Sequence, residues 1–129
     1  MQMKRAVLLA LVVAALAAPV ASAKEGAQAH LLAPLPAHPR AGSLITIRWS
    51  VDVPGTQGKR RPFGAIGMFV RLLGRSGAAT SETAPQYEPP YHVSIRVPAG
   101  GIRSIRFGLM GTSCGPSGCK PSPMFFPLR

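Results

Sequence analysis

The sequence predicts an all-β fold in which two antiparallel sheets enclose one core as a β-sandwich. After residue 23, glycine and proline recur so often that only residues 43–53 offer a stretch long enough for a typical helix. That stretch and several others alternate apolar and polar side chains, which is the pattern of a strand with one buried face. Turns rich in glycine and proline, such as VPGTQGKRRP and VPAGG, separate these segments.

The first 23 residues have the layout of a secretory signal peptide. Lys4 and Arg5 precede an apolar run from Ala6 to about Ala18, and residues 21–23 supply the small side chains that precede a cleavage site. The run is shorter than the about 20 residues that a membrane-spanning helix needs. We therefore expect cleavage after residue 23 and a secreted or periplasmic, extracytoplasmic location, with an uncleaved N-terminal anchor as the alternative.

Removal of this segment leaves about 106 residues, a length typical of one domain. We divide them into a proline-rich lead-in at residues 24–39 and a β-sandwich domain at residues 40–129. Lys4 and Arg5 leave with the signal peptide while every acidic residue remains, so the formal net charge falls from +11 to about +9. A chain with this charge is attracted to anionic surfaces.

Three segments alternate most clearly, and their apolar faces are the predicted core. In LITIRWSV, residues 44–51, this face consists of Ile45, Ile47, Trp49 and Val51. In YHVSIRV, residues 91–97, it consists of Tyr91, Val93, Ile95 and Val97. In IRSIRFGL, residues 102–109, it consists of Ile105, Phe107 and Leu109.

The remaining segments predict one more inner strand and two outer ones. AIGMFVRLL, residues 65–73, is apolar on both faces, with Ile66, Met68, Val70 and Leu72 as the favoured inner set. MFFPL, residues 124–128, favours a closing strand, and AHLLAPLP, residues 29–36, an opening edge strand interrupted by proline. Residues 74–90 are predicted to be a polar loop with little regular structure.

The two cysteines of the chain, Cys114 and Cys119, enclose the segment GPSG. Its glycines and proline allow a tight turn, and thiols outside the cytoplasm are normally oxidised. We therefore predict a local disulfide. A thioredoxin-type redox centre has two residues between its cysteines and opens a helix, and a zinc site needs two further ligands nearby, so both fit this segment less well.

The order of the segments AGSLITIRWSV, MFVRLLG, YHVSIRVPAGG and IRSIRFGLMG resembles that of small exported bacterial domains of immunoglobulin-like fold. This broad group includes the YtkA-like and CopC-like proteins, and the resemblance covers about residues 40–110. It implies an immunoglobulin-like β-sandwich. In copper-binding members of the group histidines hold the metal, commonly including the first residue after signal cleavage, which is Lys24 in this chain.

Two patterns that suggest catalysis lack the context that catalysis requires. GTSCG, residues 111–115, matches the G-x-S-x-G elbow of serine hydrolases, but no helix is expected after it and no acid or histidine follows Ser113. Glu82 and Glu88 share a polar loop, and Asp52 lies at the end of a strand, where solvated carboxylates are common. We therefore expect no catalytic residues and no enzymatic activity.

A metal site assembled by folding stays open as a second hypothesis. Histidine and methionine are the ligands that copper takes in oxidising compartments. Their spacing forms no motif in this chain, so we assign no metal ligand and no cofactor. The residues that such a site would draw on are His30, His38, His92, Met68, Met110 and Met124.

Basic residues on the polar faces of the strands are the most distinctive surface feature. Arginines occupy the middle of several predicted strands, and the turn GKRRP adds three more cations. Antiparallel sheets with one wet face would gather some of them into a patch that meets phosphate or carboxylate groups; plain solvation of the sheet is the alternative. The candidate anion contacts are Arg48, Lys59, Arg60, Arg61, Arg71, Arg96 and Arg106.

Two functions of different classes follow. The first is a non-catalytic binding domain of the cell envelope whose basic face contacts anionic lipid, a wall polymer or an acidic protein. The second is a small copper-handling protein of the envelope. Export and the few aromatic residues available for stacking disfavour nucleic acid as a partner.

Overall fold

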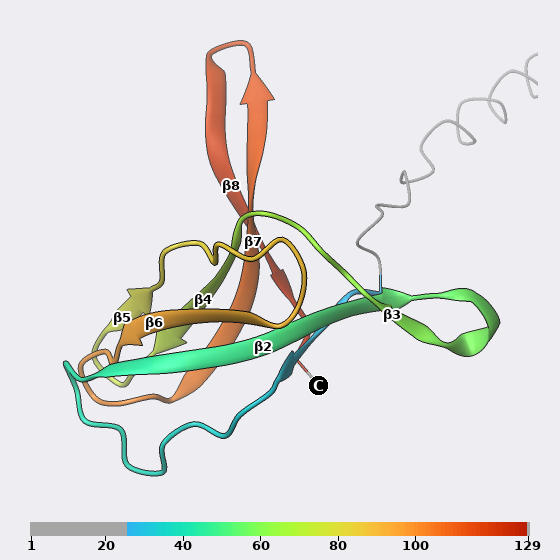
Figure 1. Ribbon diagram of the computed structural model, residues 1–129. Helices are drawn as coiled ribbons and strands as arrows, with labels where there is room; N and C mark the ends of the chain where they lie inside the picture. The colour runs from blue at the N-terminus through green and yellow to red at the C-terminus, as the bar shows by residue number, and fades with distance from the viewer. Residues whose placement is uncertain (1–25, 129) are drawn as a thin grey trace, which may run out of the picture.

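The computed structural model describes residues 26–128, and the predicted signal peptide at residues 1–23 lies outside them (Figure 1). The regular elements of the described residues are strands and one short 3-10 turn. In order these are β1 (Gln28–Leu31), β2 (Leu44–Pro54), η2 (Thr56–Gly58), β3 (Arg60–Pro62), β4 (Met68–Leu73), β5 (Ala78–Thr80), β6 (Tyr91–Arg96), β7 (Ser104–Gly115) and β8 (Gly118–Phe126).

The long strand β2 is the centre of the first sheet. Its first six residues pair with β6, from Leu44 opposite Arg96 to Trp49 opposite Tyr91. Its later residues pair with β1 and, at the end, with β3 across a hairpin. All three pairings are antiparallel. Because β1 lies within residues 24–39, part of the segment that we set apart as a lead-in is an outer strand of this sheet, where the pattern of AHLLAPLP predicts one.

The second sheet has the strand order β5-β4-β7-β8, and its pairings are also antiparallel. β7 begins opposite the end of β4, with Ser104 across from Leu73. It then passes the first residue of β4 and continues with β8 as a two-stranded arm that projects from the body, at the top of Figure 1. The all-β fold is confirmed, and two facing antiparallel sheets are consistent with the predicted β-sandwich.

The core lies between the sheets and is formed by the alternating side chains that the sequence predicts. Trp49 of β2 is fully buried and stacks on Phe107 of β7, with ring centroids 5.2 Å apart. Tyr91 of β6 is the cross-strand partner of Trp49, and their ring centroids are 5.6 Å apart. The further predicted inner residues that are buried are Ile47, Val51, Met68, Val70, Leu72, Val93, Ile95, Val97 and Leu109.

The predicted burial of one core residue is wrong. Ile66 is 61% exposed, because the chain enters β4 through Gly67 at a φ of +104° and the alternation begins only at Met68. Phe69, on the outer face of β4, is instead 2% exposed. Its ring lies across Gly108 of the neighbouring strand and meets the ring of Phe125 edge to face at 5.7 Å. An aromatic row therefore covers part of the outer face of the second sheet.

The prediction of an irregular polar loop at residues 74–90 is also wrong in part. β5 lies inside it, and the following residues continue along the edge of β4 through backbone hydrogen bonds. The amide of Ser81 donates to the carbonyl of Val70 at 2.8 Å, and that of Ala84 donates to Met68 at 2.7 Å. Backbone pairing at a sheet edge requires no apolar alternation, so the sequence pattern gives no sign of it.

Tyr91 connects the core to the chain between β3 and β4. Its hydroxyl donates to the carbonyl of Phe63 at 2.8 Å and accepts from the amide of Ala65 at 3.2 Å. Burial raises the pKa of this phenol above its ordinary value, the Ala65 hydrogen bond opposes the shift, and Glu88 adds to it. The neutral phenol is therefore the form that the fold stabilises.

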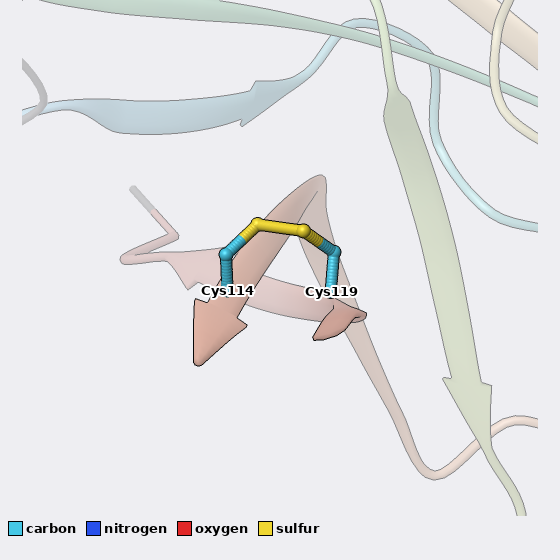
Figure 2. The surroundings of a disulfide bond; sticks show 2 residues. All are labelled: Cys114 and Cys119. Atoms are coloured by element: carbon cyan, nitrogen blue, oxygen red, sulfur yellow. A yellow bond between two sulfur atoms is a disulfide. The ribbon is translucent and has the colours of Figure 1, made fainter. Parts of the chain in front are cut away.

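The arm carries the two cysteines near its tip. Cys114 of β7 lies directly opposite Cys119 of β8, and the pair forms a disulfide across the hairpin (Figure 2). Pro121 and Pro123 of β8 face Thr112 and Met110, at alternate register positions. The amide of Met110 donates to Gly67 on the β4 side, so these two pairs are non-hydrogen-bonded pairs between β7 and β8. The backbone nitrogens of the two prolines therefore face the outer edge of the arm, where no N–H group is needed.

Candidate functional site

The seven basic residues that the sequence singles out are all exposed, but they do not share one face. Arg48 and Arg96 lie on the outer face of the first sheet, on β2 and β6. Residues 59–61 lie in the hairpin formed by β2 and β3, at the start of β3, and Arg71 and Arg106 lie on the outer face of the second sheet. The set therefore divides into three groups with different surroundings.

In the β2–β3 hairpin, Arg60 already has an anionic partner. Its Nε lies 2.5 Å from Oδ1 of Asp52, and its terminal nitrogen donates to the carbonyl of Gly26 at 2.6 Å. The other oxygen of Asp52 is 2.7 Å from Nε2 of His30. Arg60 of β3 thus links Asp52 of β2 to Gly26, which precedes β1, while its role as an anion contact stays a prediction. Lys59 and Arg61 have no ion-pair partner among residues 26–128.

Three connections meet at the opposite end of the sandwich, at the left of Figure 1. They are the loop from β1 to β2, the turn from β4 to β5 and the loop from β6 to β7. The amide of Ser76 donates to Ala99 at 3.4 Å, that of Gly42 to Val97 at 2.8 Å, and that of Arg103 to Leu73 at 2.7 Å. Short loops held together by backbone hydrogen bonds on a packed scaffold are a common location for binding residues.

This end of the sandwich, which we call the basic loop end, gathers four exposed arginines from the three connections and the end of β6. They are Arg40, Arg75, Arg96 and Arg103. Arg96 donates to the carbonyl of Gly42 at 3.0 Å, which holds its side chain against the β1–β2 loop. None of the four forms an ion pair with a described residue.

The acidic residues of the described chain lie elsewhere. Asp52 is engaged by His30 and Arg60. Glu82 and Glu88 both lie in the connection between β5 and β6. The residues beside Glu82 bond to the edge of β4, and Glu88 lies beside Gly64, which belongs to the connection between β3 and β4. The charge of the part of the chain that the structure describes is therefore asymmetric, with four cations at the basic loop end and the described carboxylates away from it. Such an arrangement attracts anions to one end.

Sequence reasoning included Arg96 but missed Arg40, Arg75 and Arg103. The mid-strand pattern and the GKRRP turn single out other cations, whereas these three lie in loops, in the segments PRAG, GRSG and GIRS. A signal was present, because alternate connections of antiparallel strands return to the same end of a sheet. Placing each loop arginine at its end of the predicted strands would have grouped them.

The outer face of the second sheet contributes a further pair. Arg71 of β4 and Arg106 of β7 are directly opposite in the register, both exposed. They lie two residues from Leu73 and Ser104, at which these strands reach the basic loop end. The two candidate anion contacts of this sheet are thus neighbours, and they lie close to the basic loop end.

The described residues include no group of three or more histidine, cysteine or acidic side chains arranged to hold a metal ion. His30 contacts Asp52, and His92 lies 2.9 Å from the side-chain amide nitrogen of Gln86. Met68 is buried in the core, while Met110 lies at the base of the arm. The residues named for a copper site are therefore spread over both sheets.

Ser113, the nucleophile position of the G-x-S-x-G pattern, lies on β7 within the arm opposite Lys120. It is part of a hairpin strand rather than of a strand-to-helix turn. The structure contains, within residues 26–128, no helix with the length and apolar character of a membrane span.

No protein family, no curated protein and no solved structure matches this chain.

Proposed function

We propose that this protein is an extracytoplasmic, non-catalytic binding domain that contacts an anionic component of the cell envelope through the basic loop end. The observation that carries the proposal is the gathering of Arg40, Arg75, Arg96 and Arg103 at one end, with every described carboxylate away from them. Arginine is suited to this task, since its planar fork of donors matches carboxylate and phosphate oxygens.

The scaffold supports the proposal. The strand orders β1-β2-β6 and β5-β4-β7-β8 correspond to the A-B-E and C′-C-F-G strands of an immunoglobulin-type sandwich, so we assign the chain an immunoglobulin-like frame. In such folds the loops cluster at the two ends of the sandwich and frequently bind ligands there. This frame also agrees with the resemblance to small exported bacterial domains.

The extracytoplasmic location is supported by the cysteine pair and by the N-terminal sequence. A disulfide on an exposed hairpin persists only where the surroundings are oxidising. The layout of residues 1–23 is that of an export signal. Outside the cytoplasm, a basic protein meets anionic lipid and polymers of the envelope, and long-range attraction speeds its association with them.

The test compares two variants with equal charge. The first replaces the basic loop end (R40Q/R75Q/R96Q/R103Q), and the second removes four cations elsewhere (R48Q/K59Q/R61Q/K120Q). Binding of the mature protein is measured to vesicles containing phosphatidylglycerol and to polyglutamate, with phosphatidylcholine vesicles as the neutral control. We expect the first variant to lose about tenfold or more in affinity, because each exposed contact contributes up to about 1 kcal/mol.

The second variant should lose at most about threefold, since it keeps the arginines that make the contact and weakens only the general attraction. Equal losses in both variants would show that net charge alone governs binding. That result, or the absence of binding to either anionic probe, would contradict the proposal.

A further inference from the structure

Arg71 and Arg106 form a cross-strand pair of like charges on the second sheet. They lie directly opposite each other on neighbouring strands, and both side chains are on the outer face. Residues opposite each other in such a pair have Cα atoms only about 5.5 Å apart. Two positive charges in this position repel, so the pair destabilises the sheet unless an anion lies between them.

Each guanidinium is held on the side away from the other by a neutral partner. Nε of Arg71 donates to the hydroxyl of Thr80 on β5, at 3.3 Å. The guanidinium of Arg106 lies 5.2 Å from the centre of the Phe125 ring, toward β8. Both side chains are therefore oriented by contacts that leave donor groups unused.

No carboxylate within residues 26–128 forms an ion pair with either arginine. Beside them, the ring of Phe125 meets that of Phe69, so the aromatic row borders the pair on one side. An apolar border reduces the screening by water of a charge next to it. The two arginines together thus offer an anion a strong attraction and several donors.

We propose that Arg71 and Arg106 bind one phosphate group between them, each exposed guanidinium turning from its neutral partner, Thr80 or Phe125, toward the other arginine so that both forks engage the phosphate. A carboxylate has two oxygens, and one bidentate arginine engages both. A phosphate group has four oxygens arranged as a tetrahedron, more than the two of a carboxylate, so two arginine forks on different sides of it can engage it together. This inference rests on the proposed function, because it names the chemical group taken by the part of the surface next to the basic loop end.

The first experiment uses inorganic phosphate as the probe. Arginine Nε–H resonances of the mature protein are followed by NMR during titration with phosphate, and with acetate at equal ionic strength. We expect the resonances of Arg71 and Arg106 to shift together and to saturate with phosphate, with at least fivefold weaker binding of acetate. Shifts of equal size and affinity with both anions would overturn the proposal.

Variants then assign the site. R71Q and R106Q should each weaken phosphate binding by about fivefold or more, whereas R48Q, which removes one exposed arginine from the middle of the other sheet, should leave it within about twofold. The same loss in all three variants would overturn the inference. The Arg48 resonance is the internal control for general ionic effects.

The source of the phosphate is distinguished by two further arms. Vesicles containing phosphatidic acid present a lipid phosphate, and glycerol 3-phosphate presents a soluble one. A lipid headgroup is assigned if R71Q/R106Q loses binding to the vesicles and glycerol 3-phosphate fails to compete with the vesicles for the wild-type protein. If R71Q/R106Q binds every phosphate probe as wild type does while R40Q/R75Q/R96Q/R103Q loses anion binding, this inference is wrong and the proposed function stands.

Discussion

The indole of Trp49 lies against the ring of Phe107 with their centroids 5.2 Å apart, and this contact joins the two sheets at the centre of the core. Both side chains are fully buried. Trp49 belongs to β2 and Phe107 to β7, the two strands from which the other strands of their sheets extend. The positions of the loops at both ends of the sandwich therefore depend on this stack.

Replacing Trp49 by alanine should lower the free energy of unfolding by about 3–5 kcal/mol, because it removes a large buried ring and leaves a cavity between the sheets. Denaturant unfolding followed by circular dichroism measures the loss. The conservative change Trp49→Phe should cost less, since part of the aromatic contact with Phe107 remains. A loss below about 1 kcal/mol for Trp49→Ala would contradict the central place of this stack.

Replacing Tyr91 by phenylalanine should cost about 1–3 kcal/mol at neutral pH, because the half-buried amide of Ala65 and carbonyl of Phe63 lose their partner. The difference should depend on pH. Since folding raises the pKa of this phenol above 10.0, its contribution is complete below pH 10 and declines as the pH rises toward and through the folded-state value.

The measurement for Tyr91 is the denaturation midpoint of wild type and Tyr91→Phe between pH 8 and pH 11. The gap between the two proteins should narrow at the alkaline end. A gap that stays constant over this range would mean that the phenol titrates alike in the folded and unfolded chains.

Gly108 should not tolerate a side chain. A Cβ added there would lie 2.5 Å from the ring of Phe69 and 2.9 Å from the carbonyl of Met124. Gly108→Ala should therefore lower stability by about 1–3 kcal/mol, as overpacking does. The double variant Gly108→Ala/Phe69→Leu should lose less than the sum of the two single changes, because the shorter side chain removes the clash. Strict additivity would mean that Phe69 does not restrict this position.

The disulfide should stabilise the arm rather than the sandwich. Its loop is short, which limits the stabilisation expected from chain entropy to about 2 kcal/mol, and the cysteines lie on the arm, past the first residue of β4. Cys114→Ser/Cys119→Ser should increase amide exchange in residues 111–122 and change the melting temperature of the core only slightly. Anion binding at the basic loop end should be unaffected. Global unfolding of this variant at room temperature would contradict this assignment.

The sequence is sufficient to predict the strands that contribute to the core, because alternation in residues 44–51 and 91–97 directly reflects which side chains are buried. It predicts the disulfide pair for a local reason, since Cys114 and Cys119 flank one turn. It does not predict β5 or the path of residues 81–84, because backbone hydrogen bonds hold them at an edge.

The candidate site was less accessible from the sequence because it depends on contacts between distant residues. Nothing near Arg60 in the chain shows that Asp52 and the carbonyl of Gly26 would engage it. The mid-strand pattern brought out Arg71 and Arg106, but only the register places them opposite each other. The basic loop end needs the ends of three connections to meet, which requires the order of strands in both sheets.

The most direct test of the account is the salt dependence of binding by the mature wild-type protein to vesicles containing phosphatidylglycerol, compared with the R40Q/R75Q/R96Q/R103Q variant. Raising the salt from about 50 to about 200 mM shortens the range of exposed charges. We predict that wild-type affinity falls by about tenfold or more, while the weak binding of the variant changes little. Wild-type binding that is insensitive to salt, or a variant that binds and responds as wild type does, would contradict the claim that these arginines contact an anionic partner.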